Sequence, residues 1–343
     1  GTLNARGTLA LGGKKGREHA LDLTVEFSRL ELDDLAPDLG VRGNFSGKVT
    51  GTGSLENPQI MVLLSGQNPG FKTYALDNVQ AQLKLVNNIL TFEQARLRKN
   101  KAQLDITGQV NVADKTLDIR AVIPETDLKS IDPAADAALA SGRLGMDISA
   151  RGSLLAPDIS GHITAVDLRL PNAPDMVANA DAAIEVNGPL DNPDALQASV
   201  HISRLALAKQ GQMLIVIENA AALLKDGRFK IDPVPVRIMD KGQLTLSAAG
   251  DIKGDLAAEV FGSLPVSILV PLTDGINSAE GDLLISLQAK GNAASPDLKG
   301  SVEFSNMALD LQALEEPLQK IKGRIVLTPQ AVEILGVTAN LGD

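Results

Sequence analysis

Few residues in this chain combine a reactive side chain with a spacing that could support chemistry. His19, His162 and His201 could act as general bases or metal ligands, because imidazole titrates near neutral pH and binds zinc. None has a second histidine at metal-ligand spacing, and there is no cysteine to act as a nucleophile or thiolate ligand. Ser153 follows Gly152 but lacks the surrounding Gly-x-Ser-x-Gly elbow. The pattern therefore predicts no catalytic residue and no metal site.

Two further patterns could bind ligands. The segment Gly51-Thr-Gly53 has the form of a phosphate-cradling Gly-x-Gly, but it lies between strand patterns and does not open a helix. Several turn aspartates could ligate calcium, but they lack dense Asp-x-Asp spacing and are better explained as turn caps. These aspartates are Asp158, Asp191, Asp194 and Asp297. We expect no cofactor, and we expect that the protein is not an enzyme.

The composition excludes a second class of function. The 343 residues carry 32 Lys and Arg against 42 Asp and Glu, a formal net charge of −10, and only 2% are aromatic. An acidic chain without stacking aromatics is a poor binder of nucleic acid, so we expect no nucleic-acid partner. The chain begins at Gly1 without an initiator methionine or a signal peptide, and we expect it to be a fragment of a longer protein.

The elements that position these residues are predicted to be strands. From residue 102 to 112 apolar and polar residues alternate: Ala102, Leu104, Ile106, Val110 and Val112 share one parity, which Gly108 interrupts. Period two is typical of a strand with one apolar and one wet face. Turns of two to four residues separate such segments, which predicts antiparallel hairpins. Segments 30–38, 126–140 and 265–277 instead look briefly helical or irregular.

Glycine and proline recur with a fixed spacing. Gly43 and Gly53, Gly142 and Gly152, and Gly281 and Gly291 are each ten residues apart around an alternating strand, and a proline follows five residues after each second glycine. A partial copy has the same glycine-to-proline spacing without the earlier glycine. Glycine supplies unusual φ angles and proline stops ladder pairing, so each unit predicts a rigid corner between strands. The predicted repeat-turn residues are Gly53, Pro58, Gly152, Pro157, Gly188, Pro193, Gly291 and Pro296.

These turns resemble those of a known family. The phrases Gly51-Thr-Gly-Ser-Leu-Glu-Asn-Pro58, Arg151-Gly-Ser-Leu-Leu-Ala-Pro-Asp-Ile-Ser-Gly161 and Lys290-Gly-Asn-Ala-Ala-Ser-Pro-Asp-Leu-Lys-Gly300 are similar to the repeat turn of the TamB branch of the AsmA-like, bridge-like lipid transfer family. The stretch from Ile321 to Ala339 is similar to that family's strand pairs. The resemblance covers nearly the whole chain.

The resemblance implies an all-β fold, an elongated antiparallel sheet curled into a U-shaped groove (a β-taco), with few short helices. It also implies a periplasmic segment of an inner-membrane-anchored protein from a Gram-negative-type bacterium, with the anchor outside this chain. The implied function is transport of phospholipid to the outer membrane, and an outer-membrane barrel of the Omp85 type is an implied partner. We expect one continuous repeat array over residues 1–343, with approximate units 1–125, 126–264 and 265–343.

The residues themselves leave the architecture open. An apolar sheet face needs a cover, and no substantial helical layer is predicted, so the sheet either folds back as a closed sandwich or solenoid or forms an open trough. A trough lined by aliphatic residues suits the acyl chains of phospholipids, which are held by area rather than by directional bonds. The groove candidates are Leu83, Leu85, Leu104, Ile106, Val110, Leu144, Met146, Ile148, Ile163, Val200, Ile202, Leu244, Leu246, Leu283, Ile285, Leu287, Val302 and Phe304.

Two alternative functions remain at this point. The chain could be a periplasmic scaffold whose sheet edges pair with strands of outer-membrane client proteins, assisting their assembly or secretion. It could also be a passive, adhesin-like solenoid with a closed core. One further feature is the basic cluster of Arg96, Arg98, Lys99 and Lys101, which is either a solvated strand end or a rim that contacts anionic lipid headgroups.

Overall fold

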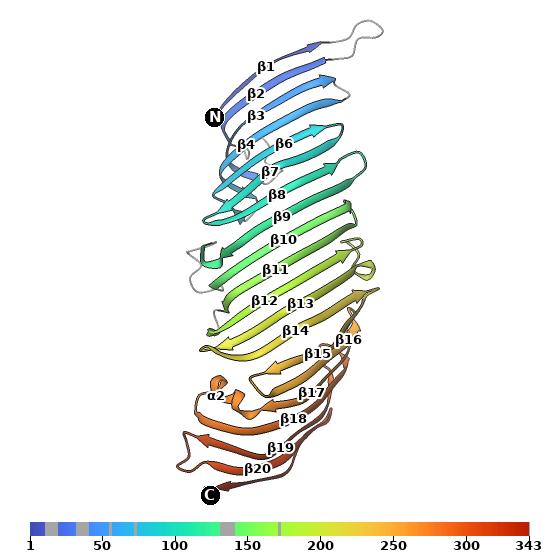
Figure 1. Cartoon of the computed structure of the whole chain (residues 1–343). Helices are drawn as coiled ribbons and strands as arrows, with labels where there is room; N and C mark the ends of the chain where they lie inside the picture. Colours follow the sequence, from blue (N-terminus) through green and yellow to red (C-terminus); the bar gives the residue numbers. More distant parts are fainter. Residues whose placement is uncertain are drawn as a thin grey trace. The chain divides into compact units, whose positions relative to one another are not determined.

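The protein is all-β, as the alternating pattern predicts. The computed structural model describes residues 1–10, 20–31, 41–54, 57–71, 74–130, 141–170 and 173–342, and most of them lie in strands (Figure 1). Contacts divide the chain into two compact units, Gly1–Thr164 and Ala165–Asp343, each of which is described by itself below. The repeat units expected at 1–125, 126–264 and 265–343 follow the sequence pattern and stay a prediction.

Unit 1 is an antiparallel sheet in chain order. Every strand from β1 to β10 pairs with the next, except that β4 pairs onward with β6, and β5 is a short strand beside β4. The strands are β1 (Thr2–Ala10), β2 (Ala20–Glu31), β3 (Val41–Ser54), β4 (Pro58–Phe71), β5 (Tyr74–Ala75), β6 (Asn78–Val86), β7 (Ile89–Lys99), β8 (Ala102–Asn111), β9 (Thr116–Asp127) and β10 (Ser141–Ser153), with η2 (Leu128–Ser130) after β9. The boundary between the units falls within β11 (Pro157–Leu170).

Unit 2 repeats this arrangement, with antiparallel pairing between each strand and the next from β12 to β21. Its strands are β12 (Ala173–Asn187), β13 (Gln197–Lys209), β14 (Gln212–Lys225), β15 (Arg228–Ile238), β16 (Gly242–Asp251), β17 (Asp255–Pro265), β18 (Ile276–Asn292), β19 (Asp297–Leu311), β20 (Leu318–Leu327) and β21 (Val332–Leu341). Its short helices are η3 (Pro193–Ala195), η4 (Val266–Ile268) and α2 (Leu269–Leu272). The hairpins expected from short turns are confirmed.

The repeated glycines adopt the unusual backbone that the sequence predicts. The two glycines of each full repeat lie near the two ends of one strand, and all of them have positive φ: in β18, for example, φ is 101° at Gly281 and 97° at Gly291. At Gly281 an added Cβ would also lie 3.0 Å from the Cα of Met307, so the neighbouring strand leaves no room for a side chain. The proline then opens the next strand or lies just before it, as Pro58 does opposite Gly53.

Of the three segments predicted to be irregular, only the last is described in full. Residues 30–31 and 126–127 belong to β2 and β9, which continue further than expected because their outer residues still pair with β3 and β10. Residues 128–130 form η2, and residues 32–38 and 131–140 lie outside the described residues. In segment 265–277, residues 266–272 form the short helices η4 and α2, as predicted, whereas Pro265 ends β17 and residues 276–277 begin β18.

Candidate functional site: the apolar sheet faces

The strand register gathers the apolar parity of unit 1 on one face of its sheet, here called the apolar face. Rows of cross-strand partners run without a break from β2 to β10. Each residue in a row is paired with one residue in the strand before it and with one in the strand after it. One row contains Leu23, Gly51, Ile60, Leu85, Leu90, Val110, Leu117 and Gly152, and the next contains Val25, Val49, Val62, Leu83, Phe92, Gly108, Ile119 and Ala150. The face is thus almost wholly aliphatic.

The opposite side, the polar face, is crossed by ion pairs between neighbouring strands. Arg96 of β7 lies 2.7 Å from Asp105 of β8, and Lys48 of β3 lies 2.9 Å from Glu26 of β2. Similar pairs join Arg120 to Asp147 and Arg151 to Asp118, and they use only side chains of the polar parity. Exposed pairs of this kind add little stability. Their consistent placement shows that this face is built to meet water.

Electrostatics agree with this assignment. A hydrogen bond from Arg120 lowers the pKa of Asp147, and a hydrogen bond from Lys48 lowers the pKa of Glu26. Both carboxylates therefore stay ionised throughout the neutral range. A lipid tail would not bind here, because it would have to strip water from charged groups.

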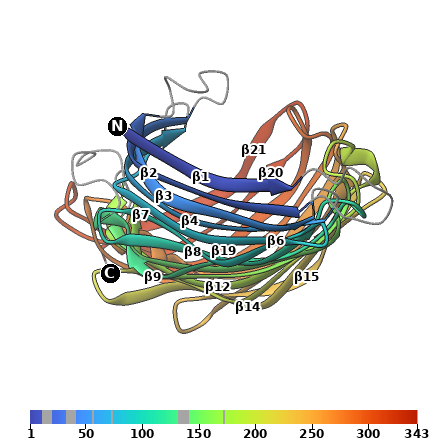
Figure 2. The ribbon, with the colours of Figure 1, turned by 90° about the horizontal axis from the view of Figure 1, so that it is seen from above.

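The two faces differ in burial as well as in chemistry. On β4, Leu63 of the polar parity is 43% exposed, whereas its neighbour Leu64 of the apolar parity is half-buried. Figure 2 shows that the strands of unit 1 are bowed. Side chains on the inner side of a bend converge and those on the outer side spread apart, so the more buried parity lies on the concave side. The apolar face of unit 1 is therefore its concave face.

Unit 2 has a matching apolar face. One row follows the register through nine strands without interruption: Leu205, Ile217, Val236, Leu244, Gly262, Ile285, Val302, Ile325 and Ile334. In β18 the alternation is complete, with Leu283, Ile285 and Leu287 half-buried and Leu284 58% exposed. The ion pairs Arg237 to Glu218, at 3.1 Å, and Arg324 to Glu303, at 3.2 Å, lie on the other face. The same division of faces therefore holds in both units.

Most of each apolar face has no second layer over it. Among the described residues, only Leu214 and Val266 are large side chains that are fully buried. The 35.9 kDa chain exposes 21163 Å² of accessible surface. A compact protein of this mass would expose about 13,000 Å², and two compact halves together about 16,000 Å². The excess over both values argues against the closed sandwich that the sequence left open.

Most of the groove candidates have the parity of the apolar face, and their role in binding lipid stays a prediction. Those in β6, β8, β10, β13, β16, β18 and β19 all have the apolar parity of their strand. Ile163 is half-buried in β11, whose boundary position leaves its face unassigned. Leu283 and Phe304 are cross-strand partners that pack against the buried cluster containing Val266 of η4, so the chain itself covers the neighbourhood of this part of the predicted groove.

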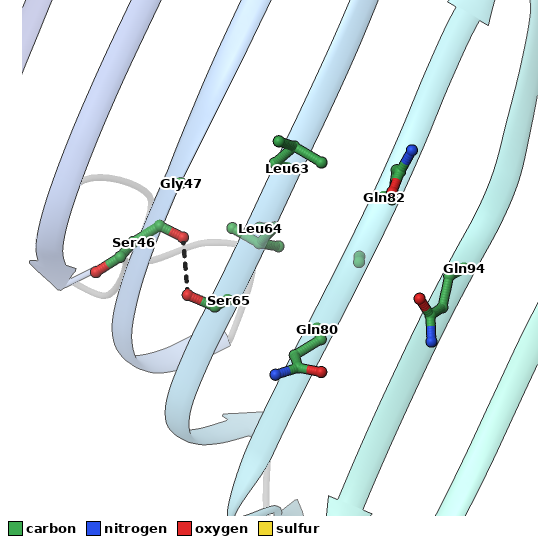
Figure 3. Close-up of a pocket in the computed structure, with 9 residues that line it drawn as sticks. Ser46, Gly47, Leu63, Leu64, Ser65, Gln80, Gln82 and Gln94 are labelled. Carbon is green, nitrogen blue, oxygen red and sulfur yellow. Dashed lines mark hydrogen bonds between the residues drawn. The ribbon is translucent and has the colours of Figure 1, made fainter.

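Sequence reasoning missed a hollow of about 340 Å³ on the polar face of unit 1 (Figure 3). Gln80 and Gln82 of β6 and Gln94 of β7 line it, together with Ser46 and Ser65. The Ser65 hydroxyl donates to the Ser46 carbonyl at 3.3 Å, and the Gln82 amide donates to Glu93. Uncharged polar residues at the wet parity of adjacent strands were the available signal. Because Ser65 and Gln82 are bonded to neighbouring residues and Gln80 and Gln94 are exposed, the hollow shows no directed ligand site.

The residues first considered for chemistry do not converge. His162 and His201 lie exposed in β11 and β13, and His19 lies outside the described residues. The described part of the chain contains no group of three or more His, Cys, Asp or Glu that could hold a metal ion. Of the four turn aspartates, Asp194 forms an ion pair with Lys253 at 3.2 Å. The other three are exposed at or near strand ends.

The basic cluster is divided between several roles. Arg96 is engaged with Asp105 on the polar face, and Arg98 donates to Gln103 at 3.2 Å on the same face. Lys99 has the parity of the apolar face, at the rim where β7 turns into β8. Lys101 is exposed in that turn, so contact with lipid headgroups stays a prediction for Lys99 and Lys101.

Comparison with known proteins adds no name. No protein-family model, curated protein or solved structure matches this chain. Within the described residues, none of the helices has the length and apolar character needed to cross a bilayer.

Proposed function

We propose that the apolar faces bind the acyl chains of phospholipids and that the chain serves as a segment of a lipid conduit. The observation that carries the proposal is the uncovered aliphatic face, continuous from β2 to β10 in unit 1 and across the strands of unit 2. Such a surface is unfavourable in water and needs a covering layer, which acyl chains can supply.

The chemistry of the face favours alkyl chains over polar ligands. Its rows contain Leu, Ile, Val, Ala, Gly and Phe and offer no convergent hydrogen-bonding groups, which a site for a specific polar ligand needs. Each methylene group removed from water contributes about 0.8 kcal/mol wherever it lies on the face. Affinity is then nearly uniform along the sheet, so a bound chain can slide between rows without crossing a large barrier.

The setting that we propose is the periplasm, between an inner membrane that holds the anchor and an outer membrane that receives the lipid. Support comes from the resemblance of the repeat turns to the AsmA-like family and from the polar face, whose ion pairs suit an aqueous compartment. An Omp85-type outer-membrane protein is the proposed docking partner at the receiving side. This part of the proposal rests on the resemblance.

A scaffold for outer-membrane proteins is the second candidate. One observation favours it: β21 pairs with β20 along one edge, and Val332 and Ile334 of this strand are each 67% exposed. Among the described strands none covers its other edge. Strand addition there would place the affinity in backbone groups of an edge rather than in apolar side chains.

The decisive experiment compares two adjacent residues of β8. Leu104 belongs to the apolar face, whereas the Gln103 amide donates to Asp105 on the polar face. A photo-crosslinking amino acid at each position in living cells should capture lipid at Leu104 and none at Gln103. Absence of lipid at both positions in a folded protein would refute the conduit.

A charge placed on the apolar face separates the two candidates. Ile106→Asp introduces a carboxylate into the aliphatic row of β8, and Thr107→Asp places the same charge one residue away on the exposed polar face. A conduit predicts that only Ile106→Asp reduces lipid delivery to the outer membrane. A scaffold that acts through strand edges predicts that both variants support assembly of client proteins.

A further inference from the structure

One short segment breaks the pattern of an uncovered face. Residues Val266–Leu272, which form η4 and α2 and are here called the strap, connect β17 to β18. The strap packs against β18 on the apolar face of unit 2. Val266 joins Ala279, Met307 and Ile321 in a buried cluster. Leu269, Val270, Leu283, Phe304, Ile276, Leu309 and Leu318 pack around it. In this region the chain supplies its own aliphatic cover.

The strap is held by this packing rather than by its own structure. A single helical turn is unstable in water, and neither η4 nor α2 has a side-chain cap. Apart from backbone bonds, the polar contact recorded for the strap is Ser267 Oγ to Met239 Sδ at 3.7 Å. The attachment therefore consists mainly of aliphatic contacts, which are the contacts that an acyl chain would make with the same residues.

Burial decreases along the strap from its start to its end. Val266 is 0% exposed and Ile268 7% exposed, whereas Leu272 is 46% exposed. Beyond the strap, Gly275 has φ of 93° and open space around it. The strap is thus deeply buried at Val266 and exposed at Leu272, and a glycine with positive φ follows it before β18. The second half of the strap therefore has less buried surface to hold it than the first half.

From these contacts we infer that the strap is a displaceable occupant of an acyl-chain site formed by Leu283, Phe304, Leu309 and Leu318. The inference rests on the proposed function and adds a gate to it. With the strap docked, these residues are closed to lipid. When Leu269 and Val270 lift, an acyl chain takes their place and the open part of the apolar face widens to include these residues. Exchange of one aliphatic cover for another keeps the cost of opening small.

Two phenylalanines allow a matched test in the full chain. Phe304 packs against the buried cluster that Val266 of the strap completes, and Phe92 lies on the uncovered apolar face of unit 1. A photoreactive phenylalanine analogue at either position reports captured lipid. We expect strong capture at Phe92 and weak capture at Phe304 in the parent chain. Adding Leu269→Asp and Val270→Asp should raise capture at Phe304 severalfold, toward the level at Phe92.

Leu272→Asp is the control variant, because it adds the same charge to the strap at an exposed position outside the buried cluster. It should leave capture at Phe304 low. In the double variant, faster amide hydrogen exchange in residues 266–272 would show that the strap has been released. If lipid is then still captured at Phe92 but capture at Phe304 is unchanged, the strap inference alone is overturned. No capture at Phe92 in the parent chain would overturn the proposed function.

A second measurement covers the case in which the double variant does not fold. In the unmodified, delipidated chain, amide hydrogen exchange of residues 266–272 is compared with and without a monomeric short-chain phosphatidylcholine. Displacement predicts that the lipid accelerates amide hydrogen exchange in the strap, most of all in its second half. Slower or unchanged exchange in the strap, with lipid bound, would show that the strap is a permanent part of the core.

Discussion

Truncation of the same side chain at an open and at a covered position tests whether the apolar face is uncovered. Ile285 of β18 belongs to the long aliphatic row of unit 2 and is half-buried with no layer over it. Ile321 of β20 lies on the same sheet but is 7% exposed, because the strap covers its neighbourhood. Ile285→Ala and Ile321→Ala remove identical atoms, so they differ only in what surrounds those atoms.

The magnitudes follow from burial. Isoleucine to alanine removes three carbon groups, which amounts to about 2.4 kcal/mol of transfer free energy when all are shielded from water. At Ile321 the truncation also leaves a cavity in a packed cluster, so we expect a loss of about 2–5 kcal/mol in the free energy of unfolding. At Ile285 part of the side chain is already hydrated and water fills the space left behind. We therefore expect a loss of about 1 kcal/mol there.

The assay is urea unfolding of the delipidated full chain, followed by circular dichroism, together with binding of a monomeric short-chain phospholipid. Ile321→Ala should lower the unfolding midpoint clearly more than Ile285→Ala, whereas Ile285→Ala should weaken lipid binding. Equal losses of stability at the two positions would mean that Ile285 has a covering layer. The inference of an open apolar face would then be wrong.

Two further predictions concern the repeat turns and the polar face. Gly291→Ala should lower the free energy of unfolding of unit 2 by about 1–3 kcal/mol, because Gly291 has a positive φ. Gly281→Ala should lower it further in the same assay, because its added Cβ would also meet Met307. Equal losses at the two positions would contradict the steric argument. The pKa of Asp147 is lowered in the folded state, mainly by its hydrogen bond with Arg120. This ion pair therefore stabilises the fold fully above the ordinary aspartate pKa of 3.8, and its contribution is lost as the pH falls through the lower folded-state pKa. Unfolding curves measured across that acid range should therefore show less loss of stability in Arg120→Gln than in the parent chain, and identical pH profiles would contradict this.

The strands were predictable because alternation is a local property. In β18 the sequence places Leu283, Ile285 and Leu287 on one parity, and the structure keeps them on one face. Short turns then determine the pairing of neighbouring strands: Asn87 and Asn88 both have positive φ, which a two-residue hairpin turn requires. The parity and the face of most groove candidates followed from these two local rules.

Other features depended on contacts that periodicity does not reveal. Register shifts, such as the one between Asp181 and Ala182 opposite β13, insert residues that no alternating pattern marks. The cover over Phe304 comes from a segment that looked helical in the sequence, but its docking position depends on how β17 and β18 are joined in space. The sharing of charges across strands, as between Arg96 and Asp105, likewise needs the register before it can be seen.

The strap also explains how part of the apolar face is shielded from water although the sheet is not closed. An all-β chain with one aliphatic face has a single kind of surface on which an apolar, non-strand segment can lie without exposing itself to water. The run from Val266 to Leu272 is therefore directed to that face by its composition, whatever the details of the loop. The same reasoning applies to an acyl chain, because the face binds any aliphatic surface, whether it belongs to the protein or to a lipid. If the strap and a lipid compete for Leu283 and Phe304, occupancy of this part of the face depends on lipid concentration, and the gate responds to the cargo itself.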